Sequence, residues 1–444
     1  MISDPLILSV ILIAIMFVFL LSSLWIGVSL MLTGIIGMLL FDHNLPPVIS
    51  VYDKIGDLLA SSLYDALNSW SLAALPMFIL MGEILYKSSI STRLLNGLKP
   101  WLAYIPGGLL HVNVAACSLF AAVSGSSAAT TATVGKITLE ELKNRGYSKM
   151  LAMGSLAGSG TLGYLIPPSL IMIIYGVLSD VSIGKLFVAG LLPGLLLASL
   201  YSFYIMYRAK VDPSILPNEK EVFTFKDRMN SFKDLAPIFS LIGLVLGSIY
   251  GGFATPTEAA ALGVLGSLIL AFYFKSISID VLKNALLNSV KTSVMIGFII
   301  AGAVFLSQVI GFLGIARAMS EFITGLGLSP MMLILLIGVM YIILGMILEA
   351  ISIVVMTLPI VLPIVILAGF DPLWFGIFLV FMVEMAQITP PVGFSLFVIQ
   401  GISNEKIQTI LKATFPFFLL MILTVVLITV FPEIVFFLPE QMIK

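Results

Sequence analysis

Long apolar runs, separated by short polar segments, follow one another along almost the whole chain. A helix needs about 20 apolar residues to cross the hydrocarbon core of a membrane. Runs of that length predict full spans at 5–24, 25–42, 71–87, 183–207, 236–252, 255–274, 293–313 and 413–438. The pattern therefore predicts an all-α membrane protein.

Four further apolar stretches contain residues that interrupt a helix. They predict two re-entrant helical hairpins, at 102–140 and 330–368, and two broken helices, at 149–178 and 372–402. Ser124–Ser127 interrupts the first hairpin, and Glu349 lies in the middle of the second. Pro167-Pro168 and Pro390-Pro391 interrupt the two helices, because proline lacks an N–H donor and clashes with the preceding turn.

Three segments are more polar. The connectors 43–70 and 276–292 are amphipathic, as expected of interfacial helices that act as arms. The segment 208–234 is the one long polar stretch, and we expect it to be a cytoplasmic linker.

The interruptions recur at one spacing, which predicts an internal repeat. Pro167-Pro168 and Pro390-Pro391 lie 223 residues apart, and the same offset carries Gly146-Tyr147 to Gly369-Phe370 and Ser126 to Glu349. The Lys and Arg clusters within 87–99, 136–149, 208–233 and 275–291 can all lie on the cytoplasmic side if both termini face outward, which makes the hairpins enter from opposite sides. We therefore expect two inverted repeats, 1–207 and 235–444. Both repeats are expected to contribute helices to a scaffold domain and to a transport domain.

Composition narrows the function. The chain is 60% hydrophobic and 10% charged, whereas soluble domains are about 25% charged; lipid is therefore its main solvent. A net charge of −1 disfavours nucleic acid as a partner. The single Cys117 excludes an internal disulfide, and the phosphate-binding motif GxxxxGK[ST] is absent. We expect no ATPase, so energy must come from an ion gradient or a partner.

The interrupted segments are candidate ion sites, because a broken helix frees carbonyl groups that attract cations and N–H groups that attract anions. At the first hairpin tip, hydroxyls and carbonyls are expected to bind a cation. At the proline breaks, the candidate carbonyl donors are Gly163, Ile166, Ala386 and Thr389. The alternatives are close packing of small residues at the tip and simple proline kinks.

Several acidic residues lie in apolar surroundings. Glu349 can bind sodium, carry a proton or cap the following helix. Glu258 stands three residues after Thr255, which favours a structural capping box. No specific role is predicted for Glu83 or Glu384, and Arg317 is expected to snorkel near the end of a span.

Taken together, the segment Ser124–Thr133, the segment Thr255-Pro256-Thr257-Glu258-Ala259, the paired prolines and the length resemble the large membrane subunit of tripartite ATP-independent periplasmic (TRAP) transporters. The resemblance implies a sodium-coupled importer in the inner membrane that works by an elevator mechanism. It also implies a periplasmic binding protein that delivers an organic acid, such as a C4-dicarboxylate or a sialic acid. A small four-helix membrane subunit is expected as a separate polypeptide.

The resemblance also maps site residues onto this chain. The sodium sites map onto Ser124, Gly125, Ser126, Ser127, Gly163, Ile166 and Pro168 in the first half, and onto Gly345, Glu349, Ala386 and Thr389 in the second. The organic acid is expected against Ser126, Ser127, Thr130, Pro167 and Pro390.

Three other functions are alternatives to this interpretation. A stand-alone sodium/dicarboxylate symporter shares hairpins and inverted repeats but needs no binding protein. An intramembrane hydrolase requires a GxSxG-like nucleophile or paired aspartates within spans, and neither is seen. A passive channel more often uses rings of ligands from symmetric subunits.

Overall fold

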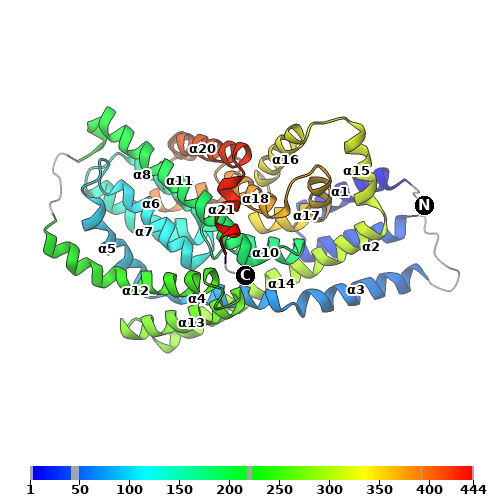
Figure 1. Cartoon of the computed structure of the whole chain (residues 1–444), viewed down its shortest axis with the longest axis horizontal. Helices are drawn as coiled ribbons and strands as arrows, with labels where there is room; N and C mark the ends of the chain where they lie inside the picture. Colours follow the sequence, from blue (N-terminus) through cyan, green and yellow to red (C-terminus); the bar gives the residue numbers. More distant parts are fainter. Residues whose placement is uncertain (1–3, 42–49, 218–222, 392, 443–444) are drawn as a thin grey trace.

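The computed structural model describes residues 4–41, 50–217, 223–391 and 393–442. These residues form helices joined by short connections (Figure 1). Within this part of the chain, eight helices are long and apolar enough to cross a membrane. The predicted all-helical membrane fold is confirmed.

The first half contains the following helices: α1 (Pro5–Leu21), α2 (Ile26–Leu40), α3 (Val51–Leu67), η1 (Trp70–Ala73), α4 (Ala74–Lys87), α5 (Ile90–Leu102), α6 (Leu110–Ser124), α7 (Ser127–Asn144), α8 (Lys149–Gly160), α9 (Leu162–Leu165), α10 (Leu170–Ser179), α11 (Ile183–Val211) and η2 (Pro213–Ile215). The second half contains α12 (Phe225–Tyr250), α13 (Pro256–Tyr273), α14 (Ile279–Phe312), α15 (Ile315–Gly325), α16 (Pro330–Gly345), α17 (Ala350–Leu367), α18 (Pro372–Gln387), α19 (Phe394–Ser403), α20 (Ile407–Val430) and α21 (Glu433–Glu440).

The helix bounds repeat at the spacing of the proline pairs. Helices α7 and α17 both have 18 residues, and their first residues are 223 positions apart. The first residues of α8 and α18 are also 223 positions apart. The connection before α8 turns at Gly146 (φ +83°), and the connection before α18 turns at Gly369 (φ +90°). Both turns use glycine because other residues rarely adopt this left-handed backbone conformation.

Some predicted boundaries were wrong. The arm expected at 276–292 and the span expected at 293–313 form one helix, α14, because no glycine or proline interrupts residues 280–296. The expected linker 208–234 is helical at both ends, since α11 continues to Val211 and a capping box at Thr224 starts α12. The last expected span divides at Pro432 into α20 and α21. The arm 43–70 contains α3 and ends at the first residue of η1, and its residues 43–49 lie outside the described part.

The two hairpins, α6–α7 and α16–α17, lie on either side of α10 and α18 (Figure 1). Helices α3, α4, α12, α13 and α14 run along one side of this group (Figure 1). Helix α14 packs against α2, α3 and α4, and α13 packs against α4. Close approach depends on small residues: a Cβ atom at Gly302 of α14 would lie 2.7 Å from the carbonyl oxygen of Gly27 in α2.

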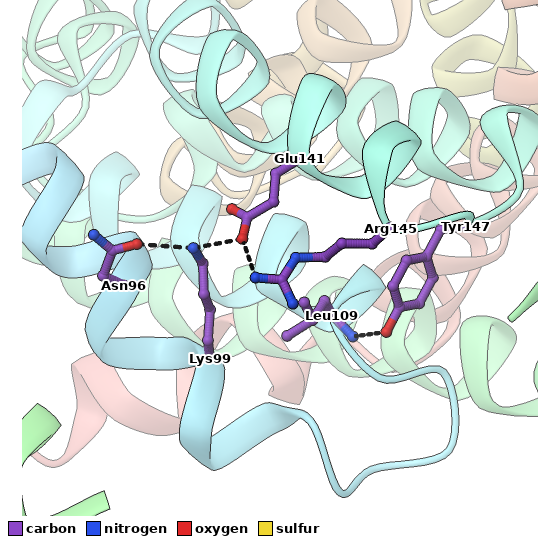
Figure 2. Close-up of polar contacts among 6 residues, drawn as sticks. All are labelled: Asn96, Lys99, Leu109, Glu141, Arg145 and Tyr147. Carbon is purple, nitrogen blue, oxygen red and sulfur yellow. Dashed lines mark hydrogen bonds and ion pairs between the residues drawn. The ribbon is translucent and has the colours of Figure 1, made fainter. Parts of the chain in front are cut away.

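Charged residues tie the base of the first hairpin to α5 (Figure 2). The Glu141 carboxylate of α7 lies 2.7 Å from Lys99 Nζ of α5 and 2.7 Å from Arg145 Nη2. Helix α5 is in turn held to α12, because Arg93 pairs with Asp234 at 2.7 Å. The hairpin base is therefore connected through α5 to the row of helices beside it.

The packing of α8 on α20 yields a prediction of stability. A Cβ atom at Gly154 would lie 2.2 Å from the carbonyl oxygen of Ala413, and backbone cannot rotate away. We expect Gly154→Ala to destabilise the protein by about 1–3 kcal/mol, as overpacked cores do, and to lower the Tm of the detergent-purified chain.

The matched control is Gly247→Ala in α12, where a Cβ atom meets nothing within 4 Å. This change should leave Tm unchanged or raise it, because alanine favours helices over glycine by up to about 1 kcal/mol. Equal Tm values for the two variants would contradict the close packing of α8 on α20.

Candidate functional site

The first hairpin turns sharply at its tip. Helix α6 ends at Ser124, and Gly125 follows with φ +61°, a conformation that favours glycine. Ser126 is the N-cap of α7, and its hydroxyl accepts from the Ala129 N–H at 3.5 Å. The hydroxyls of Ser124 and Thr130 lie 2.9 Å apart. The predicted tip residues therefore lie together at the junction of the two helices.

This tip packs on the broken helix of the same half. The N–H of Leu170, which begins α10, donates to the carbonyl of Gly125 at 3.2 Å. A Cβ atom at Gly163 would lie 2.5 Å from Ser127 Cα, so only glycine fits there without displacing the tip. Ile166 and both prolines between α9 and α10 are buried. The structure thus brings the tip together with Gly163 and the residues 166–168.

The second hairpin makes the corresponding contact in its own half. A Cβ atom at Gly345, the last residue of α16, would lie 2.0 Å from the Cβ of Ala386 in α18. Glu349 is the N-cap of α17 and accepts from the Ser352 hydroxyl at 3.4 Å. The Thr389 hydroxyl donates to the Met385 carbonyl at 2.6 Å. The predicted residues of the second half therefore also lie at one tip and one break.

The two regions differ in exposure. Pro167 and Pro168 are buried, whereas Pro390 and Pro391 are exposed. At the tips, Ser126 is half-buried and its counterpart Glu349 is exposed, whereas Ser127 and its counterpart Ala350 are both buried. The first proline break is therefore enclosed by protein, and the second is exposed.

Glu384 connects the two halves and was missed as a site residue. It lies in α18 and is 0% exposed. Its Oε1 accepts from the Tyr164 N–H at 3.0 Å and from the Ser127 hydroxyl. Its Oε2 has no hydrogen-bond partner among the described residues. The one signal in the sequence was a carboxylate in an apolar span, which marks a functional candidate by default.

Three buried hydroxyls on α7, α8 and α19 lie outside the residues assigned individually to sodium or to the organic acid. They have no hydrogen-bond partner within the described ranges and belong to Thr131, Ser159 and Ser395. Helix α7, which carries Thr131, packs against both α8 and α19, which carry the other two. Unpaired buried hydroxyls are costly, so they mark places where a ligand or water can bind.

The remaining charged candidates have structural roles. Glu258 forms the predicted capping box, because its Oε2 accepts from the Thr255 N–H at 2.8 Å and its own N–H donates to the Thr255 hydroxyl at 3.3 Å. Glu83 pairs with Lys87 at 3.6 Å and accepts from Asn288 at 3.1 Å. Arg317 pairs with Glu321 at 2.9 Å on α15, and both of these side chains are exposed.

The chemistry of the two regions is rich in oxygen. Carbonyls and hydroxyls dominate, and each region has one carboxylate. Among the described residues, no group of three or more His, Cys, Asp or Glu side chains could hold a metal ion. Oxygen ligands of this kind suit a hard cation rather than a transition metal.

Comparisons with known proteins identify a transporter family. The family described as "Tripartite ATP-independent periplasmic transporter, DctM component" matches residues 13–434. The C4-dicarboxylate TRAP transporter large permease protein DctM of Pseudomonas aeruginosa is 34% identical over 383 residues, which are 86% of this chain and 89% of that protein. The sialic acid TRAP transporter permease protein SiaT of Haemophilus influenzae is 30% identical over 86% of this chain and 62% of that protein.

A solved structure shares the fold. The YdaH transporter of Alcanivorax borkumensis superimposes with a TM-score of 0.64 and covers 94% of this chain and 99% of its own. Its sequence identity is 13%, so this likeness concerns the fold alone.

The contact between the second tip and its break can be tested by exchanging two small side chains. Gly345→Ala should lower Tm, because the added methyl group overlaps the Ala386 methyl group. Adding Ala386→Gly to the same chain removes that overlap and should restore most of the loss. A double variant no more stable than Gly345→Ala alone would contradict the contact.

Proposed function

The chain belongs to the DctM family of tripartite ATP-independent periplasmic transporters, and we propose that it carries a small organic acid across the membrane together with sodium. It is a multi-pass large membrane subunit and a transporter component, not an enzyme. The observation that carries the proposal is the pair of hairpin tips, each packed on a broken helix of its own half.

Sodium is proposed to bind at each tip. Unwound carbonyls and helix C-terminal ends coordinate sodium in transporters built from broken helices. In the first half, the groups that would hold it are Ser124, Gly125, Ser126, Ser127, Gly163, Ile166 and Pro168. In the second half, they are Gly345, Glu349, Ala386 and Thr389. The residues of both halves supply oxygen ligands.

The organic acid is proposed to bind between these sites, against Ser126, Ser127, Thr130, Pro167 and Pro390. The helices α7 and α10 begin at the first tip and break, and α17 and α19 begin at the second. Helix N-termini carry free N–H groups and partial positive charge, which favour a carboxylate. The relatives named for C4-dicarboxylate and sialic acid support an acidic substrate.

The proposed assembly has three components. A periplasmic binding protein delivers the acid, and a small four-helix membrane subunit binds beside the scaffold. The complex lies in the inner membrane with both termini of this chain in the periplasm. The two halves are inverted repeats, and transport occurs by an elevator movement of the hairpins and broken helices against the other helices. The repeating helix bounds and the positions of the Lys and Arg residues support this arrangement.

Uptake into proteoliposomes tests the proposal. The vesicles contain the chain with its small membrane partner, and a labelled C4-dicarboxylate or sialic acid is added with or without an inward sodium gradient. We expect uptake only when both the gradient and the binding protein are present.

Each other outcome has a definite meaning. Equal uptake without a sodium gradient would contradict sodium coupling. Uptake without the binding protein favours the stand-alone symporter. In that case the selectivity for the acid must lie in this chain.

Substitutions at the tips test the proposed ion sites. Ser126→Leu or Thr389→Leu replaces an oxygen with a bulky apolar group, and we expect each to abolish uptake while the protein still inserts into the membrane. The matched control is Thr429→Leu in α20, whose hydroxyl also donates to the carbonyl four residues earlier, at 2.7 Å. Uptake is measured beside the amount of inserted protein. Normal sodium-dependent uptake in either tip variant would exclude that tip as an ion site.

A further inference from the structure

The buried carboxylate of Glu384 acts on the first tip from the opposite half of the chain. Ser127 and Glu384 are 257 positions apart in sequence, yet the Ser127 hydroxyl donates to Glu384 Oε1. A hydroxyl that donates its one hydrogen to a carboxylate directs its lone pairs elsewhere. The lone pairs of Ser127 are therefore free to face a cation at the tip.

The same oxygen also holds the backbone beside the tip. Oε1 accepts from the Tyr164 N–H at 3.0 Å, and the preceding residue, Gly163, lies against Ser127. One carboxylate oxygen thus holds two sides of the first candidate sodium site, the hairpin tip and the turn of α9. Displacing this oxygen would change the geometry of both sides at once.

No basic side chain forms an ion pair with Glu384 in the described ranges. Its hydrogen-bond donors, the Ser127 hydroxyl and the Tyr164 backbone N–H, are both uncharged. A buried carboxylate without a cationic partner is costly. A sodium ion at the adjacent tip would supply that missing partner.

This arrangement is not repeated in the second half. At the offset of 223 residues, Thr161 corresponds to Glu384 and Ala350 corresponds to Ser127. The Thr161 hydroxyl donates to the Gly158 carbonyl at 2.6 Å within its own half, and Ala350 has no hydroxyl. The second tip instead carries its own carboxylate, Glu349.

We propose that Glu384 is a positioning residue for the first sodium site. It orients the Ser127 hydroxyl toward the ion and holds the α9 turn against the hairpin tip. This inference rests on the proposed sodium coupling. Carboxylates that orient metal ligands in this way affect metal affinity about 10- to 100-fold when they are removed.

The test measures sodium binding by the purified full-length chain without its transport activity. A ligand that binds the folded state raises Tm as its concentration increases. Tm is followed against sodium chloride concentration, with choline chloride keeping the ionic strength constant. Glu384→Gln keeps the size of the side chain but removes its charge, and we expect it to raise the half-saturating sodium concentration at least about tenfold.

The matched control is Trp374→Phe on the same helix. It removes one buried hydrogen bond, from Trp374 Nε1 to the Ile428 carbonyl at 2.8 Å, far along α18 from the tip. This variant should lower Tm at all salt concentrations without moving the sodium midpoint. If Glu384 has a purely structural role, Glu384→Gln should likewise lower Tm at all salt concentrations without moving the sodium midpoint.

A double-variant comparison tests whether Glu384 acts through Ser127. Ser127→Ala should also raise the midpoint, and Glu384→Gln added to it should raise the midpoint little further, because the shared interaction is already lost. If Glu384→Gln does not fold, the sodium midpoint of Ser127→Ala serves as the test. A midpoint equal to that of the unmodified chain overturns the inference. Independent, additive shifts overturn it as well.

The failure of this inference is distinguishable from failure of sodium coupling. If sodium fails to stabilise the unmodified chain relative to choline, both proposals are overturned. If sodium stabilises the unmodified chain and Glu384→Gln behaves as Trp374→Phe does, only the role of Glu384 is overturned.

Discussion

Backbone N–H and C=O groups must be satisfied by protein wherever a helix is interrupted inside a membrane, because lipid offers them no partners. This chain interrupts its helices at two hairpin tips and two proline pairs. It covers the first break with the first tip, through the bond from the Leu170 N–H to the Gly125 carbonyl. The second tip packs on α18 just before the second break, through the contact of Gly345 with Ala386, and leaves Pro390 exposed.

The two halves satisfy that constraint with different chemistry. The first tip is rich in hydroxyls and packs on a buried break, and the carboxylate that contacts it comes from the other half. The second tip contains its own carboxylate, Glu349, and the proline break of that half is exposed. Similar backbone in the two halves therefore surrounds different side chains.

Helix α18 contacts both hairpin tips. Its last turn carries Ala386, which contacts the second tip, and Glu384, which contacts the first. A movement of α18 must therefore affect both tips. Because α18 also packs against α16, α17 and α20, the packing of the second half bears directly on the first hairpin tip.

The sequence alone predicted the spans, the hairpin tips, the proline breaks and their common offset of 223 residues. These features are local: proline lacks its N–H in any context, and an apolar run needs lipid or a core wherever it lies. Local patterns also misplaced boundaries, as in the continuous helix α14. Only the tertiary structure decided that Glu384 meets Ser127 and Tyr164, and that one break is enclosed while the other is open. Those contacts join residues more than 200 positions apart, and the packing of whole helices brings them together.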